Sequence, residues 1–171
     1  MRFLKTLVLG LAAVALYAPG PASAQTGPDS TTTKERGYVI ECTGAYRGQR
    51  VWLSVYENNV FANVFQVTIG DGGTGASRQS DTGFVDDGAV KATIRLEGKK
   101  LKVIGTAERV GPRTPVHAEH DDAGQHVVED GYHREVLADL SMKWKDRTIP
   151  LTCDNAFFYK LTVTKTDTTG D

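Results

Sequence analysis

The histidines of this chain are concentrated in one short segment. All four of them fall within the 17 residues from 117 to 133, and carboxylates are interleaved with them. Neutral imidazole together with carboxylate is a common ligand set for zinc or copper. The segment therefore predicts a metal site, with metal-dependent hydrolysis as one activity that the site could support. The candidate ligands are His117, His120, Asp121, His126 and His133.

Two other interpretations of the same segment stay open. The spacing matches no recognised metal motif, since H-E-x-x-H is absent and no cysteine lies nearby, and a solvated acidic loop would have the same composition. The segment could also sense pH, because imidazole titrates near pH ~6.5 and neighbouring acids raise that value. We expect a long loop here, from Gly111 to Gly131, in which a short strand near Pro115 to Glu119 could add to the strand count.

Aromatic residues form a second candidate site. A two-residue turn at 58–59 would place Tyr56 opposite Phe61 and Trp52 opposite Phe65, so that all four share one face of a hairpin. The opposite face of that hairpin is apolar too, so one of the faces must be covered by a second layer, a ligand or a partner. These four residues are the candidate ligand-binding set, and the alternative is that they fill an ordinary core.

The sequence offers no catalytic motif. It lacks G-x-S-x-G, and its Gly-rich segment from Gly70 to Gly83 has neither the spacing and lysine of a P-loop nor a calcium-loop pattern. That segment is expected to be a flexible connection. We therefore predict a binding protein without enzymatic activity or cofactor, with a small apolar molecule or a protein as its partner; the metal site is the alternative.

The N-terminus has the pattern of a secretory signal peptide. Arg2 and Lys5 precede an apolar run from Leu7 to Tyr17, and an A-x-A site occupies residues 22–24. The run is too short to span a bilayer, which takes about 20 apolar residues. We expect residues 1–24 to be removed and the mature protein to be secreted, either into a periplasm or out of the cell.

Net charge and cysteine content bear on the partners of the protein and on its covalent cross-links. Loss of the signal peptide changes the formal net charge from −1 to −3, and the charges are interspersed along the sequence, so no nucleic-acid partner is expected. The two cysteines, Cys42 and Cys153, have 110 residues between them. An even cysteine count in an exported chain predicts a disulfide bond.

The remaining sequence predicts an all-β domain. Short alternating runs dominate residues 37–165, whereas 25–36 and 166–171 are polar and expected to be disordered or flexible. Further hairpins are expected around turns at 98–99 and 146–147. Together these runs give about eight antiparallel strands, which fits a single-domain β-barrel or β-sandwich closed by one disulfide. The pairs expected in the two further hairpins are Leu96 with Leu101 and Trp144 with Ile149.

Overall fold

A computed structural model describes residues 29–168, and all regular structure in that range is β-strand. The expected signal peptide lies outside the described residues. Short runs of β-branched and aromatic residues, separated by turns with left-handed backbone, give this strand content. The strands are β1 (Ser30–Tyr46), β2 (Gln49–Tyr56), β3 (Asn63–Ile69), β4 (Thr74–Ser80), β5 (Val85–Asp86), β6 (Ala89–Leu96), β7 (Lys99–Arg109), β8 (Thr114–Asp122), β9 (Gln125–Trp144) and β10 (Arg147–Asp167).

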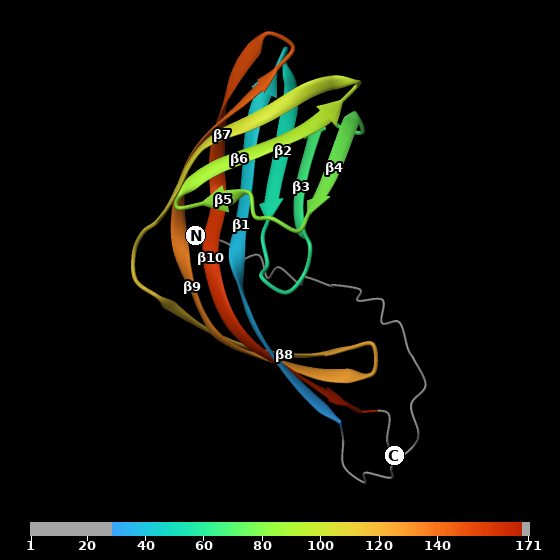
Figure 1. Cartoon of the computed structure of the whole chain (residues 1–171), viewed down its shortest axis with the longest axis vertical. Helices are drawn as coiled ribbons and strands as arrows, with labels where there is room; N and C mark the ends of the chain where they lie inside the picture. The colour runs from blue at the N-terminus through green and yellow to red at the C-terminus, as the bar shows by residue number, and fades with distance from the viewer. Residues whose placement is uncertain (1–28, 169–171) are drawn as a thin grey trace.

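The strands form one antiparallel sheet in the order β4-β3-β2-β1-β10-β9-β7-β6-β5, with β8 paired to β9. The sheet curls until β4 faces β6, but it does not close into a barrel, and it is not a two-sheet sandwich (Figure 1). Side chains rather than a backbone ladder join those two strands, since Arg78 Nη1 donates to the Thr93 carbonyl at 2.9 Å. All-β antiparallel structure is confirmed, whereas the closed barrel and the sandwich were wrong.

The strand count exceeds the prediction because polar segments expected as loops are strands. β4 lies within the Gly-rich segment 70–83, and β8 and the start of β9 lie within 111–131, where the sequence indicates at most a short strand near 115–119. Both β4 and β8 pair along one side only, so water covers much of their surface and no apolar alternation is required. A search for alternating apolar residues therefore does not detect such strands.

The long strands β9 and β10 continue beyond the curled part of the sheet. Together with the start of β1 and with β8 they make a four-stranded extension, here called the ribbon (Figure 1). Residues 30–36, expected to be disordered, pair with 160–166 in this ribbon, and Asp167 pairs with Gln125. Threonine is a good strand former, and the ladder to β10 gives these polar residues their backbone partners.

Two of the predicted hairpins have the expected faces and a register shifted by two residues. Leu96 pairs with Lys99 rather than with Leu101, and Trp144 pairs with Arg147 rather than with Ile149. The turns occupy 97–98 and 145–146, where all four residues have positive φ, as a type I′ turn requires. A shift of two keeps every side chain on its face.

The β2–β3 hairpin is shifted by three residues, and this reverses the prediction for its aromatic residues. Phe65 lies opposite Val55, and Trp52 lies opposite Thr68, because a loop from 57 to 62 replaces the expected two-residue turn. An odd shift moves one strand's side chains to the other face. Phe65 is therefore in the core at 0 % exposure, whereas Trp52 is only partly buried on the opposite face.

This register predicts unequal effects of two aromatic substitutions. Phe65→Ala should lower the free energy of unfolding by about 3–5 kcal/mol, because it empties a filled core position. Trp52→Ala should cost clearly less, since part of the indole is already in water. Urea unfolding followed by circular dichroism measures both values. Equal losses would contradict the assignment of the two side chains to opposite faces.

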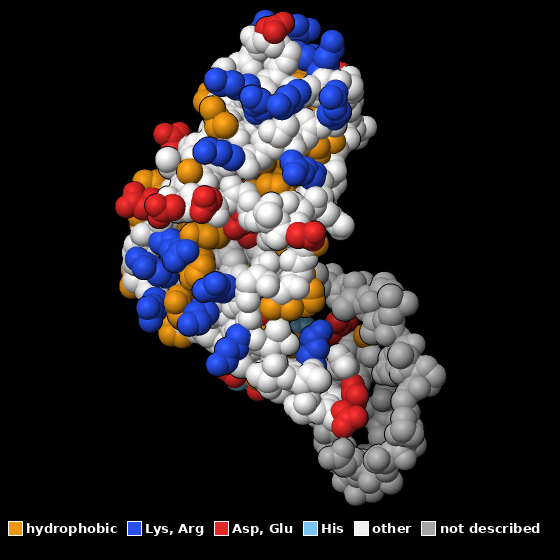
Figure 2. Space-filling model, in the orientation of Figure 1, with side chains coloured by type: hydrophobic (Ala, Val, Ile, Leu, Met, Phe, Trp, Pro, Cys, Tyr) orange, Lys and Arg blue, Asp and Glu red, His pale blue; other side chains and the backbone are white. Residues whose placement is uncertain are grey.

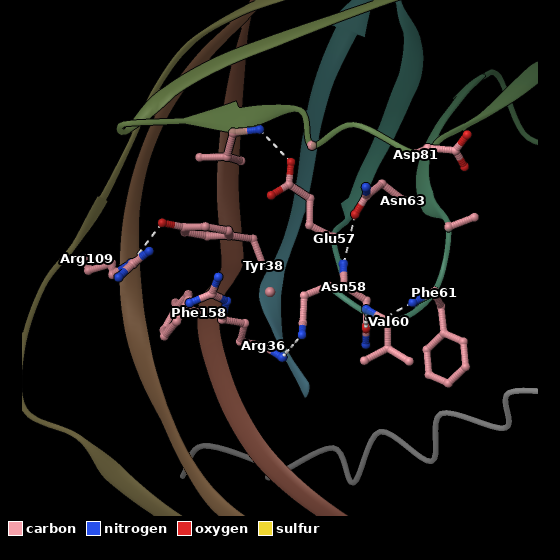
Figure 3. Close-up of a pocket in the computed structure, with 15 residues that line it drawn as sticks. Arg36, Tyr38, Glu57, Asn58, Val60, Phe61, Asn63, Asp81, Arg109 and Phe158 are labelled. Carbon is pink, nitrogen blue, oxygen red and sulfur yellow. Dashed lines mark hydrogen bonds between the residues drawn. The ribbon is translucent and has the colours of Figure 1, made fainter. Parts of the chain in front are cut away.

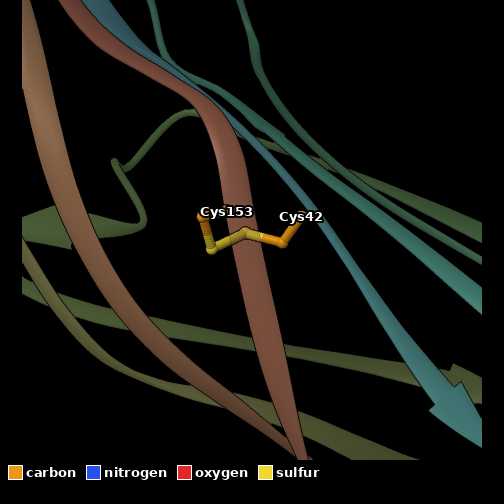
Figure 4. The surroundings of a disulfide bond; sticks show 2 residues. All are labelled: Cys42 and Cys153. Carbon is orange, nitrogen blue, oxygen red and sulfur yellow. A yellow bond between two sulfur atoms is a disulfide. The ribbon is translucent and has the colours of Figure 1, made fainter.

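The expected disulfide is present. Cys42 on β1 bonds to Cys153 on β10 where the β1–β10 ladder changes register (Figure 4). Cys42 is 1 % exposed and belongs to the main apolar core, which fills the inside of the curled sheet. The disulfide thus ties together the two central strands, on which both the curled part and the ribbon depend.

Candidate functional site

A cleft opens inside the curled sheet, at the end that faces the ribbon (Figure 3). Its volume is about 680 Å³. β1, β7 and β10 form one wall, and the 57–62 loop with the segment before β5 forms the other. The residues that the argument below uses are Arg36, Tyr38, Glu57, Val60, Phe61, Asp81, Arg109 and Phe158.

One wall of the cleft combines aromatic rings with guanidinium groups. The Arg109 guanidinium carbon lies 3.8 Å from the centre of the Phe158 ring, and Arg109 Nε donates to the Tyr38 hydroxyl at 2.8 Å. The Tyr38 and Phe158 rings meet edge to face at 5.2 Å between centres. Arg109 is thereby held flat against the wall, with its two terminal nitrogens free of hydrogen bonds to the described residues.

Two further arginines lie on β1 and β9, close to this wall by strand register. Arg134 lies directly opposite Phe158 in the β9–β10 ladder, and its buried Nε has no hydrogen-bond partner among the described residues. Arg36 lines the cleft from β1, two residues before Tyr38. The wall is therefore cationic, and it can offer planar donor pairs to an anion.

The facing loop is held in place by a buried amide, Asn58. Its Nδ2 donates to the Tyr159 hydroxyl at 2.9 Å, and its Oδ1 accepts from the backbone N–H of Val60 at 2.7 Å and of Phe61 at 3.2 Å. The Asn58 backbone N–H donates to Asn63 Oδ1 at 2.9 Å. Asn58 is 4 % exposed, so these bonds replace water that cannot enter. They fix Val60 and Phe61 at the rim of the cleft.

The carboxyl group of Glu57 lies on the same side of the cleft. It accepts hydrogen bonds from the backbone N–H groups of Phe84 and Val85, which anchors the segment before β5 over the cleft. Burial raises the pKa of Glu57, and the two amide donors offset part of that rise. Backbone contact with the loop also explains Gly37, because a Cβ there would collide with the Glu57 carbonyl.

The lining of the cleft combines apolar surface with charged groups. An apolar body would contact Phe158, Tyr38 and Val60, while an anionic group would meet the Arg109 guanidinium. None of the lining side chains is a serine, cysteine or histidine nucleophile with an adjacent base. Asp81, on the far side, would repel an anion placed away from the arginines.

The predicted aromatic set is not brought together. Phe61 alone of the four lines the cleft, at its rim. Tyr56 stacks on Tyr159 outside it, Phe65 packs against Phe84 in the core, and Trp52 borders a separate hollow over β2, β3 and β4. The cleft residues Tyr38, Arg109 and Phe158 went unnoticed in the sequence, because each comes from a different strand and no short motif contains them.

The predicted metal ligands lie on the β8–β9 hairpin and not in a loop. His117 Nδ1 lies 2.7 Å from Asp130 Oδ1, and its Nε2 lies 3.2 Å from Glu119 Oε1. His126 Nδ1 lies 3.0 Å from Asp121 Oδ1. Within residues 29–168, no three His, Cys, Asp or Glu side chains are grouped so that they could hold a metal ion. His120 and His133 do not join His117, and His133 instead lies against the ring of Phe157.

The contacts of His117 raise the pKa of its imidazole. The hydrogen bond to Asp130 and the negative charge of that carboxylate raise the pKa of His117 above its ordinary 6.5, with a smaller contribution from Glu119. We expect Asp130→Asn to lower the pKa of His117 and Glu119→Gln to lower it less. Nuclear magnetic resonance titration of the imidazole signals measures both effects. A pKa unchanged by Asp130→Asn would contradict the pairing.

No family model matches the chain, and no curated protein or solved structure matches it either. Over the part of the chain that the structure describes, no helix is long and apolar enough to cross a membrane.

Proposed function

We propose that this protein is a secreted, non-enzymatic binding protein that holds a small ligand in the cleft beside Arg109. The ligand that suits the cleft has an apolar body and one anionic group, such as a carboxylate or sulfonate. The observation that carries the proposal is the Arg109 guanidinium, which contacts the Tyr38 hydroxyl and the Phe158 ring while its terminal nitrogens make no hydrogen bond to residues 29–168.

The side chains of this site are already held in place in the folded protein. Tyr38 and Phe158 are each 8 % exposed and fixed by the β1–β10 ladder, and Arg109 is restrained by both of them. A ligand would therefore bind without first ordering the cationic wall, which favours affinity. On the opposite rim, Val60 is 45 % exposed and Phe61 is 37 % exposed, so binding would remove apolar surface from water.

Two matched dyes test the proposal. The probe 8-anilino-1-naphthalenesulfonate has an apolar body and a sulfonate, and N-phenyl-1-naphthylamine has the same body without the charge. Fluorescence titration of the mature protein should show one site for each dye. Arg109→Gln should weaken the sulfonated dye by about 10-fold or more, as expected for loss of a charged hydrogen bond, and should change the neutral dye little.

The control is Arg113→Gln, which removes an exposed arginine that lies over the ring of Tyr132 and does not line the cleft. Its affinities for both dyes should equal those of the unmodified protein. Thermal unfolding of each variant shows whether the fold is intact. The proposal fails if Arg109→Gln, folded, binds the sulfonated dye as tightly as the Arg113→Gln control does.

A further inference from the structure

One end of the molecule is rich in positive charge, although the sequence intersperses it. The β6–β7 and β9–β10 hairpins end close together, and Figure 2 shows Lys and Arg side chains gathered over this end. Acidic residues dominate the opposite end, at the tip of the β8–β9 hairpin. The cationic end is here called the basic tip. Its residues are Arg95, Lys99, Lys100, Lys102, Lys143, Lys145 and Arg147.

Within the basic tip, like charges lie directly opposite each other. Lys102 pairs with Lys143 across β7 and β9, and Arg95 pairs with Lys100 across β6 and β7. Like charges in such cross-strand positions destabilise a sheet. Among the described residues, the basic tip has one ion pair, between Lys145 and Glu97. Most of its positive charge is therefore uncompensated within the protein.

The five lysines of the basic tip and Arg147 line a hollow of about 570 Å³, together with Thr148 and one carboxylate, that of Asp146. Its floor is Trp144, which is 4 % exposed and packs against Tyr46 with 4.8 Å between ring centres. Lys145 Nζ lies 4.0 Å from the centre of the Trp144 ring. The hollow thus has a rigid aromatic floor and a cationic wall, so a bound anion would meet positioned ammonium groups.

We propose that the basic tip binds a linear acidic polysaccharide, one that carries sulfate or carboxylate on successive sugars. Cations on neighbouring strands are repeated at about 4.8 Å, so the surface suits a polymer with regularly repeated charges. This site is separate from the cleft beside Arg109, since the two share no lining residue. The basic tip would hold the protein on an anionic matrix while the cleft stays open.

Two observations favour this partner over other polyanions. Single-stranded nucleic acid is held by bases stacking on accessible aromatic rings, and the aromatic ring of the hollow, Trp144, is buried. Membrane surfaces are held by charge together with inserted apolar side chains, and none of the exposed large apolar residues of the described chain lines the hollow. A soluble polymer recognised through its charges requires neither feature.

Heparin is the probe for the test, and isothermal titration calorimetry of the mature protein at several salt concentrations is the measurement. Affinity should fall steeply with salt, because bound counterions are released. The double variant Lys102→Gln/Lys143→Gln should bind about 10-fold more weakly, with a shallower salt dependence. Lys34→Gln/Lys165→Gln, which removes the same charge from the ribbon, should stay within about 2-fold of the unmodified protein. Arg109→Gln should also bind heparin normally, so the two proposals fail independently.

Several outcomes would overturn the proposal. Equal heparin binding by the two lysine double variants would show that the tip is not the site. Tighter binding to single-stranded oligothymidylate or to phosphatidylglycerol vesicles than to heparin, lost in Lys102→Gln/Lys143→Gln, would assign the tip to nucleic acid or to lipid. Salt-sensitive self-association in sedimentation experiments, lost in the same variant, would instead assign it to the acidic end of a second copy.

Discussion

Replacing Cys42 and Cys153 together by alanine should lower the free energy of unfolding by about 2–5 kcal/mol. The disulfide closes a segment of 110 intervening residues, which is most of the described chain, so its loss greatly increases the freedom of the unfolded state. The bond also holds β1 against β10 where their ladder changes register. Guanidinium unfolding of the unmodified protein and of the double variant measures the difference.

The matched control for this result is the unmodified protein in a reducing agent. It should unfold at the same denaturant concentration as the double variant, since both lack the bond and differ only in two small side chains. A double variant within about 1 kcal/mol of the oxidised protein would show that the β1–β10 ladder alone restrains the chain.

Asn58→Ala should cost about 2–4 kcal/mol of folding free energy. The substitution leaves the N–H groups of Val60 and Phe61 without their partner. It also removes one donor to the buried Tyr159 hydroxyl, which keeps its own bond to the Glu57 carbonyl. Each buried group left unpaired costs about 1–3 kcal/mol, and relaxation of the loop recovers some of the sum. Urea unfolding measures the loss.

Asn59→Ala is the control for that substitution. Asn59 is the adjacent amide and also makes hydrogen bonds, to the backbone of Lys34 and Arg36, but it is exposed and water can replace them. We expect a loss below about 1 kcal/mol. If the two variants were equally stable, the buried amide would not be what holds the rim of the cleft.

The parts of the fold that the sequence predicts correctly are those determined by local residue patterns. Alternation identified the faces of the β6–β7 and β9–β10 hairpins, and the compartment expected from the N-terminus made a Cys42–Cys153 bond the natural pairing. The exact turn was missed in both hairpins, because Glu97 and Lys145 adopt positive φ although their residue types seldom do. That error of two residues left the faces intact.

The β2–β3 hairpin failed for a different reason. The pair Asn58-Asn59 fits a two-residue turn by composition, but both amides hold a wider loop together by bonding to distant groups such as Tyr159 and Lys34. Long-range bonds of this kind are invisible in a local pattern. The resulting three-residue shift in register places Trp52 and Phe65 on opposite faces of the sheet. The predicted aromatic face is therefore not formed.

The candidate sites depended on contacts between strands that are remote in sequence. Arg109, Tyr38 and Phe158 meet because β1, β10, β9 and β7 are neighbours in that order, and no single segment contains more than one of them. The charge separation was hidden for the same reason, since a formal net charge of −3 averages over opposite ends. The clustered histidines, the most conspicuous feature of the sequence, are spread along a hairpin, where His117 and His126 pair with different carboxylates.

The position of the disulfide also determines how the protein would respond to tension. Ser30 of β1 pairs with Thr166 of β10, so both ends of the described chain lie at the same end of the ribbon (Figure 1). A force that pulls these ends apart would separate β1 from β10 one hydrogen-bonded pair at a time, and the separation would stop at Cys42–Cys153. Beyond that point the covalent bond carries the load. The segment between the two cysteines, which includes the Arg109 side of the cleft and the whole basic tip, would remain mechanically shielded while the ribbon gives way.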